Sequence, residues 1–153
     1  MTVELKIEGF AELMQELKGL EPKLRNKVYG VSLRAGSKIV QQAAKEQAPT
    51  KDGLLKKGIL VRRDTKAKKF GLIRDTIGFS KDAWYGRLVE YGHKIVRGGR
   101  LGKGGKVVGH VAAKPFLRPA FDNNVEKTVS AIKSKFHSEL DKLHLPKLKS
   151  GRS

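Results

Sequence analysis

The pattern of apolar and polar residues predicts both helices and strands. Residues 2–8 alternate between apolar and polar side chains, which is typical of a half-buried strand. In residues 10–20 the apolar positions recur at steps of three and four, which indicates a short helix. A longer stripe of this kind runs from Pro22 to Gln47, and proline is tolerated in a first helical turn. Pro49 should end this second helix, because the residue before a proline is disfavoured in the helical conformation.

The middle of the chain favours short strands joined by basic segments. The patterns at 58–63 and 70–79 predict a hairpin, with the basic connector 62–69 at its exposed tip. Residues 82–90 predict a short helix that a glycine ends. The segment 94–106 holds five glycines and five cations without an acidic residue, so we expect a loop there. A return strand should follow at 107–111.

The last third of the chain has the strongest helical pattern. Apolar residues recur at steps of three or four from Phe121 to Leu143, and Pro146 should end this helix. The sequence therefore predicts an α+β fold in which a small antiparallel sheet packs against a long helix in the N-terminal half and a long C-terminal helix. We expect one domain at residues 1–143, followed by a basic flexible tail at 144–153.

The composition adds a strong positive charge to this picture. The chain has 33 Lys and Arg against 15 Asp and Glu, a formal net charge of +18. We therefore expect an anionic partner, and nucleic acid, an acidic membrane surface or an acidic face of a neighbouring protein would all fit. No apolar run approaches the roughly 20 residues that span a bilayer, and the N-terminus lacks the pattern of a signal peptide. We accordingly expect no membrane partner. The absence of cysteine excludes disulfides and thiolate zinc sites.

No pattern of catalytic or metal-binding residues stands out. His93, His110, His137 and His144 have no metal-ligand spacing, and the common hydrolase, metalloprotease and kinase motifs are missing. Glu90 lies among aromatic residues and could be a catalytic acid. A structural carboxylate, bonded to backbone N–H groups or arginines, is favoured because no partner carboxylate accompanies it. We predict no enzymatic activity, no metal and no cofactor.

Two other features leave alternatives open. The run RGGRLGKGGK at 97–106 does not match the phosphate-binding pattern GxxxxGK[ST]. It fits a flexible basic loop that contacts phosphates, an arm ordered against a neighbouring subunit, or a solvated loop. A group of aromatic residues fits either the core, which is favoured, or a stacking platform for single-stranded nucleic acid: Phe70, Phe79, Trp84, Tyr85 and Tyr91.

Three segments, taken in order, resemble the signature of the neck or tail-component proteins of long-tailed bacteriophages, the family of tail-completion and head-tail joining proteins. They are APTKDGLLKKGI at Ala48–Ile59, YGRLVEYGH at Tyr85–His93 and KPFLRPAF at Lys114–Phe121. The order, spacing and flanking helices fit, and the resemblance covers about residues 10–140. Glycine permits tight turns and proline restricts the backbone, so these motifs make sense as scaffolding.

The resemblance implies a non-enzymatic virion protein of the head-tail junction. It implies that copies of the chain form a ring that helps to join or complete the tail and lets DNA pass. The expected partners are other copies, head-closure or connector proteins, tail terminator or tail tube proteins, and DNA in the lumen. The expected location is the virion, after assembly in the host cytoplasm. The alternative is a stand-alone basic nucleic-acid-binding protein, favoured by the charge of +18. A small nuclease is a third candidate, but it needs an acidic metal-binding cluster that the sequence does not show.

These interpretations assign roles to two sets of residues. We predict contacts with DNA or a partner through the cations of the two basic segments: Arg62, Arg63, Lys66, Lys68, Lys69, Lys94, Arg97, Arg100, Lys103 and Lys106. The resemblance implies a structural role for twelve motif residues: Pro49, Gly53, Leu55, Tyr85, Glu90, Tyr91, Gly92, Pro115, Phe116, Leu117, Arg118 and Pro119.

Overall fold

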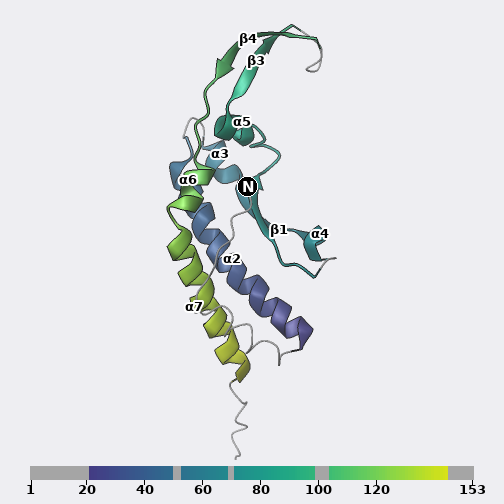
Figure 1. Ribbon diagram of the computed structural model, residues 1–153, viewed down its shortest axis with the longest axis vertical. Helices are drawn as coiled ribbons and strands as arrows, with labels where there is room; N and C mark the ends of the chain where they lie inside the picture. Colours follow the sequence, from purple (N-terminus) through teal and green to yellow (C-terminus); the bar gives the residue numbers. More distant parts are fainter. Residues whose placement is uncertain (1–20, 50–52, 69–70, 99–103, 145–153) are drawn as a thin grey trace, which may run out of the picture. The chain divides into compact units, whose positions relative to one another are not determined.

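The computed structural model describes residues 21–49, 53–68, 71–98 and 104–144 (Figure 1). The predicted α+β fold class is confirmed, with two small antiparallel sheets, β1 with β2 and β3 with β4, and two long helices. The strand expected at 2–8, the helix at 10–20 and the tail from 145 onward lie outside the described residues. The elements in chain order are α2 (Pro22–Gln47), α3 (Leu54–Gly58), β1 (Ile59–Arg63), α4 (Thr65–Lys68), β2 (Asp75–Phe79), α5 (Gly86–Tyr91), β3 (His93–Arg97), β4 (Lys106–Val111), α6 (Leu117–Asp122) and α7 (Val125–His144).

Contacts along the chain group the residues into two compact units. Unit 1 comprises 1–37, 63–75 and 126–153, and unit 2 comprises 38–62 and 76–125. Unit 1 therefore holds the first part of α2, α4, nearly all of α7, the last residue of β1 and the first residue of β2. Unit 2 holds the rest of the elements. The single domain predicted for residues 1–143 stays a prediction.

Unit 1 is held by an apolar contact between α2 and α7. Val28 packs with Phe136 and Leu140, and all three are buried. The ring of Tyr29 lies 5.8 Å from that of Phe136, a distance typical of aromatic pairs. At Gly36 an added Cβ would lie 2.6 Å from Ile132 Cγ1, so the absence of a side chain lets the two helices approach closely.

A buried carboxylate provides the polar contacts of unit 1. The side chain of Asp75, at the start of β2, is only 1% exposed. Its oxygens lie 2.7 Å from Arg63 Nε and 3.2 Å from Arg34 Nε. A guanidinium N–H of Arg63 also donates to the carbonyl of Gly30 at 2.6 Å. This arrangement compensates the cost of burying the carboxylate and ties α2 to the strands.

Unit 2 is built around small and aromatic residues. Its buried cluster comprises Ala44, Ala48, Leu55, Ile59, Ala83, Phe116 and Ala120. Phe79 packs against this cluster and meets Phe116 nearly edge-on, with 6.0 Å between ring centroids. The amide of Gln41 donates to the carbonyl of Ile59 at 2.7 Å, which ties α2 to β1 within the unit.

The structure corrects the prediction for the connector 62–69. Its residues 65–68 form the helical turn α4, in which Ala67 is buried, so the connector is not simply an exposed tip. Asp64 explains the turn, because its carboxylate accepts the backbone N–H groups of Lys66 at 2.9 Å and of Ala67 at 3.3 Å. The strand expected at 70–79 covers only 75–79.

The loop expected at 94–106 is also corrected. Residues 93–97 form β3, which pairs antiparallel with β4 and has an irregularity between Ile95 and Val96. The many glycines and cations of this segment hid two adjacent β-branched residues, which favour a strand. The return strand expected at 107–111 is confirmed and begins one residue earlier.

The short helix predicted at 82–90 and the predicted last helix differ from their expected bounds. The helix expected at 82–90 is α5 and begins at Gly86, after a turn. The final helical stretch is divided at Asn123 and Asn124, which separate α6 from α7. The side-chain amide of Asn124 donates to the carbonyl of Ala120 at 2.9 Å, an alternative to the helical backbone pattern that asparagine often offers.

Candidate assembly interface

Glu90 is the buried polar centre of unit 2. It lies in the last turn of α5, and it is only 5% exposed. Its carboxylate accepts three backbone N–H groups at the start of α6, from Phe116 at 2.8 Å, Leu117 at 3.0 Å and Arg118 at 3.2 Å. This is the structural arrangement that the sequence favoured over a catalytic acid.

The hairpin β3–β4 leaves the body of unit 2 next to Glu90. Gly92 joins α5 to β3 with a φ of 69°, and an added Cβ would lie 2.6 Å from the carbonyl oxygen of Val111. The segment that follows β4 is fixed beside the end of α5, because the N–H of Lys114 donates to the carbonyl of Val89 at 2.8 Å. The start and the end of the hairpin are therefore held side by side.

The hairpin extends outward from α5 (Figure 1), and much of its apolar surface is exposed. Five of its β-branched residues are exposed: Ile95, Val96, Val107, Val108 and Val111. Within the described residues β3 pairs only with β4, so the outer edge of each strand has no neighbour there. Unpaired strand edges and exposed apolar side chains are both features of surfaces that bind other chains.

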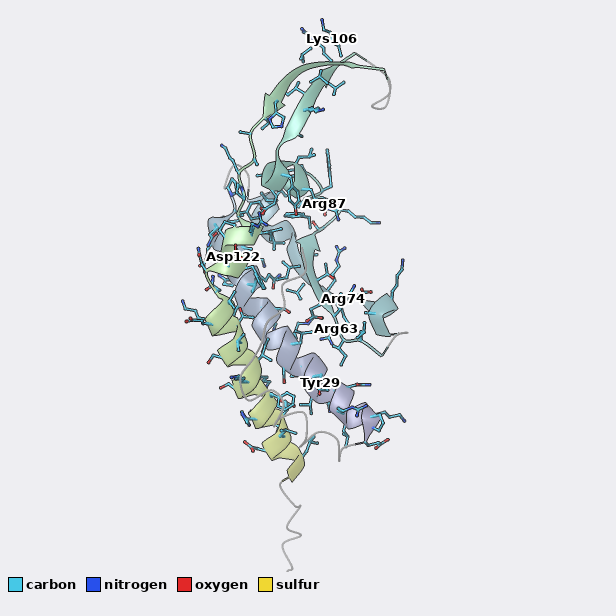
Figure 2. All side chains as sticks on the ribbon, in the orientation of Figure 1. Tyr29, Arg63, Arg74, Arg87, Lys106 and Asp122 are labelled. Atoms are coloured by element: carbon cyan, nitrogen blue, oxygen red, sulfur yellow. The ribbon has the colours of Figure 1, made fainter. Side chains whose placement is uncertain are left out.

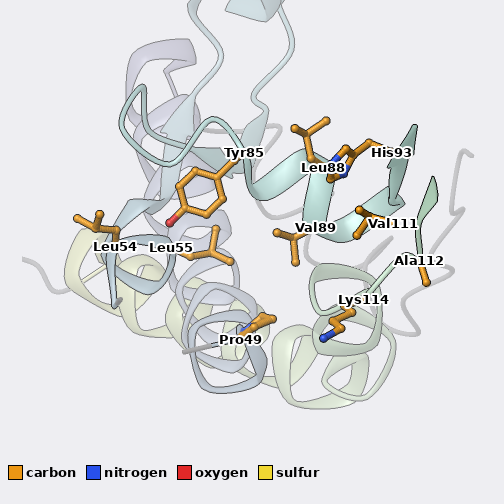
Figure 3. Close-up of a pocket in the computed structure, with 10 residues that line it drawn as sticks. All are labelled: Pro49, Leu54, Leu55, Tyr85, Leu88, Val89, His93, Val111, Ala112 and Lys114. Atoms are coloured by element: carbon orange, nitrogen blue, oxygen red, sulfur yellow. The ribbon is translucent and has the colours of Figure 1, made fainter. Parts of the chain in front are cut away.

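An apolar groove of about 380 Å³ lies at the base of the hairpin. Figure 3 shows its side chains, which come from all three motif segments and from β4. Tyr85 and Val89 line one part, and Leu55, which is buried, lines another. The complete set is Pro49, Leu54, Leu55, Tyr85, Leu88, Val89, His93, Val111, Ala112 and Lys114. The motifs thus meet in one place, although they are far apart in the sequence.

The remaining motif residues belong to the same unit. Gly53 precedes α3 with a φ of 67°, a conformation that favours glycine. Phe116 is buried in the core, and Leu117 packs against the core. Pro119 is half-buried in α6, and Pro115 and Arg118 are exposed. The structural roles that the resemblance implies for these residues stay predictions.

The predicted basic contacts are distributed over both units. In unit 2, Lys94, Arg97 and Lys106 are exposed on the hairpin, with Lys106 at its outer end (Figure 2). Arg62, also in unit 2, is exposed on β1, whereas Lys66 of unit 1 is exposed on α4. Lys69, Arg100 and Lys103 lie outside the described residues, as does the side chain of Lys68. The predicted DNA or partner contacts remain untested.

Arg63 differs from the other predicted contact residues. Its guanidinium group is occupied by Asp75 and by the carbonyl of Gly30 inside unit 1. Sequence reasoning missed this role, since nothing in the pattern links Asp75 to arginines 12 and 41 residues away. The position of Asp75 beside a basic segment is the signal that could have suggested it.

The aromatic residues divide between core and surface. Phe79 and Tyr85 pack against the core of unit 2, as the favoured interpretation expected. Trp84 and Tyr91 are 66% and 78% exposed, so the core interpretation is wrong for both. Their positions on a turn and at the end of a six-residue helix explain this, because neither element is long enough to bury all its faces. Phe70 lies outside the described residues.

No group of three or more histidine, cysteine or acidic residues in the described ranges could hold a metal ion. None of the described helices is long and apolar enough to cross a membrane.

The comparison with protein families decides the relationship. Residues 11–92 match the family described as "Bacteriophage HK97-gp10, putative tail-component". This match spans more than half of the 153 residues. The chain belongs to this family. No curated protein and no solved structure matches the chain.

Membership of the tail-component family supports a structural function, and the matched region covers only part of the resemblance. It supports a structural role in a phage tail, and hence a place in the virion. The matched region includes the first motif and ends at Gly92, within the second. The hairpin and the third motif lie beyond it, even though Phe116 of the third motif contacts Glu90 of the second.

Proposed function

We propose that this tail component acts at the head-tail junction of a phage particle, where copies of the chain form a ring. The ring helps to join or complete the tail and leaves a central passage for DNA. Head-closure or connector proteins lie on one side, and tail terminator or tail tube proteins on the other. Family membership supports the structural role in the tail, and the features of the hairpin support the ring.

The observation that carries the proposal is the exposed apolar hairpin. A two-stranded hairpin is marginally stable alone in water, and this one exposes five β-branched residues. Contact with a second copy would remove that surface from water, at about 25 cal/mol per Å² of apolar area. The groove at the base of the hairpin is a different surface of the same chain. Contacts between two different surfaces are heterologous, and heterologous contacts with a suitable rotation close into rings.

The cations of the hairpin are suited to contacts with the DNA in the passage or with a neighbouring protein. Lys94, Arg97 and Lys106 are exposed, and Lys106 is at the outer end. On a ring subunit, such side chains can face either the passing DNA or an acidic neighbour. The alternative of a stand-alone nucleic-acid-binding protein rests on the same cations and on the charge of +18.

Assembly of the purified chain tests the proposal. Electron microscopy and light scattering should show closed rings, either of the chain alone or after addition of portal and tail proteins. The double substitution Val96→Thr and Val108→Thr keeps the β-branched shape and removes apolar contacts. We expect it to raise the concentration for half-assembly by about tenfold, which corresponds to about 1.4 kcal/mol.

Leu72→Thr is the matched control, because Leu72 and Val108 are both 53% exposed but Leu72 lies outside the hairpin. The control should assemble as the unmodified chain does. A chain that stays monomeric in the presence of its portal and tail partners would overturn the proposal. Tight duplex binding by that monomer would establish the alternative.

A further inference from the structure

A second cleft in unit 2 shares Leu88 of α5 with the apolar groove but has a different chemistry. Its volume is about 410 Å³, and it is lined by residues of β1, of β2 with the following turn, and of α5. The lining combines three cations, one hydroxyl group and three apolar side chains: Arg62, Phe79, Ser80, Lys81, Trp84, Arg87 and Leu88. No acidic residue lines it.

Trp84 is the exposed ring of this cleft. It is 66% exposed, although tryptophan is among the largest apolar side chains, and it meets Tyr85 edge-on at a centroid distance of 6.4 Å. The turn that carries it is fixed from below. The N–H of Ala83, which is fully buried, donates to Ser80 Oγ at 3.3 Å, and the N–H of Ser80 donates to the carbonyl of Gly58 at 2.7 Å. Trp84 is thus presented outward by a rigid support.

The three cations of the cleft are available to a ligand. Arg62, Lys81 and Arg87 are exposed, and no ion pair is found for any of them among the described residues. Asp82 is the neighbouring acidic residue, and it is exposed without lining the cleft. The lining therefore carries three positive charges beside an apolar surface formed by Phe79, Trp84 and Leu88.

We infer that this cleft binds an acidic segment of another protein, in which apolar side chains lie next to carboxylates. The apolar side chains would pack on Trp84 and Leu88, while the carboxylates would bind the guanidinium groups of Arg62 and Arg87. Tryptophan and arginine are also the residue types that contribute most at protein interfaces. The inference goes beyond the proposed function, since a ring could form without any contact at this cleft.

Nucleic acid fits the cleft less well than a protein segment does. In duplex DNA the bases are stacked inside, so the apolar surface around Trp84 would gain no partner. Sites for single-stranded nucleic acid stack successive bases on several aromatic rings. Of the two rings that line this cleft, Phe79 is half-buried and packed edge-on against Phe116, which leaves Trp84 as the exposed one.

The fluorescence of Trp84 provides a direct test, because it is the only tryptophan of the chain. The full chain, kept below the concentration at which it assembles, is titrated with the synthetic peptide EELLEE. We expect the emission of Trp84 to move from that of a water-exposed indole to shorter wavelength. The peptides QQLLQQ and EEGGEE keep only the apolar or only the charged part, and each should bind at least about tenfold more weakly.

Substitutions in the chain complete the experiment. Arg62→Gln together with Arg87→Gln should weaken EELLEE binding by about tenfold. Lys23→Gln together with Lys27→Gln makes the same change in net charge on exposed residues of α2 and should leave the affinity unchanged. Trp84→Ala, followed by calorimetry, should abolish binding while the circular dichroism of the fold is retained.

Three results would overturn the inference. One is an emission of the free chain that is already that of a buried indole, which would mean that the chain fills its own cleft. Another is unchanged emission on addition of EELLEE. The last is tighter binding of single-stranded oligothymidylate than of the peptide. None of these results depends on ring formation, so failure here and failure of the proposed function are distinguishable.

Discussion

Glu90 supplies the N-terminal cap of α6, although it lies 26 residues before Phe116 in the chain. The first N–H groups of a helix have no partner within the helix, and a capping side chain usually comes from the residue just before it. Here the capping position is Phe116, which has no suitable side chain. The carboxylate of Glu90 takes its place and accepts three N–H groups.

Glu90→Gln should therefore destabilise the chain strongly for so small a change. An amide has one carbonyl oxygen in place of two carboxylate oxygens, and its NH₂ group would face N–H donors at the other position. We expect the free energy of unfolding to fall by about 2 kcal/mol, the scale of a lost charged hydrogen bond in a buried site. Urea denaturation, followed by circular dichroism, measures this change.

Glu46→Gln is the control for Glu90→Gln. Glu46 is exposed and accepts a hydrogen bond from Gln42, which a glutamine can also accept. Its effect should stay within about 0.5 kcal/mol. Equal stability of the two variants would contradict the capping role of Glu90.

Sequence reasoning reached part of this site. The isolated carboxylate indicated a structural role, because no partner carboxylate accompanied Glu90. Its partners were not predictable, since backbone N–H groups are the same at every residue and carry no sequence signal. The exposure of Trp84 was missed for a related reason, because the pattern around it does not reveal which face of a short turn meets the core.

At the scale of elements, the prediction succeeded where the hydrophobic pattern repeats over many residues. The helix α2 is confirmed from Pro22 to Gln47, because many turns of one apolar stripe specify a single structure. The sequence predicts part of the hairpin β3–β4 as a loop, because its strands are short and are interrupted by glycine and lysine. Its β-branched residues favour strands only when a second strand supplies the hydrogen bonds, and that partner is 14 residues away for Ile95 and 11 for Val96.

Gly92→Ala tests how the hairpin is joined to the body of unit 2. The substitution places a Cβ 2.6 Å from the carbonyl oxygen of Val111 and 2.8 Å from the backbone nitrogen of Ala113. Backbone atoms cannot move aside as a flexible side chain can. We expect a loss of about 3 kcal/mol in the free energy of unfolding, from both the positive φ and the overpacking.

Gly53→Ala separates these two causes. Gly53 has nearly the same φ, 67° against 69°, but an added Cβ meets no atom within 4 Å. It should therefore lose only the conformational part, about 1 kcal/mol. If Gly92→Ala and Gly53→Ala unfold at the same urea concentration, the close contact with the returning strand is not important.

At the scale of the whole molecule, family membership and charge give different kinds of information. The match over 11–92 supports a structural role in a phage tail, which no single residue could have indicated. The charge of +18 indicates an anionic partner without identifying it. The fold class could be predicted from the sequence because it depends on hydrophobic patterns that extend over many residues. The partners depend instead on surfaces that several distant segments form together.

The salt dependence of duplex binding tests whether the hairpin cations reach DNA. For phosphate contacts, the slope of log K against log salt should decrease by about 0.9 for each contact removed. Arg97→Gln together with Lys106→Gln should therefore reduce the slope by nearly 2 units if both side chains bind phosphates. The control is Lys127→Gln together with Lys133→Gln, which makes the same charge change on a different element, α7. Equal slopes for the two variants would show that the hairpin does not contact duplex DNA.

The bond between Lys114 and Val89 has a consequence for how such a protein can diversify. This hydrogen bond joins the residues just before and just after the hairpin, close to Gly92, where the hairpin begins. The body of unit 2 is therefore held together without residues 93–111. Insertions, deletions or exchanges within residues 93–111 would leave the core of that unit intact. If neighbouring copies bind through the hairpin, as we propose, that contact could be altered within this stretch while the helices and the cap at Glu90 are inherited unchanged.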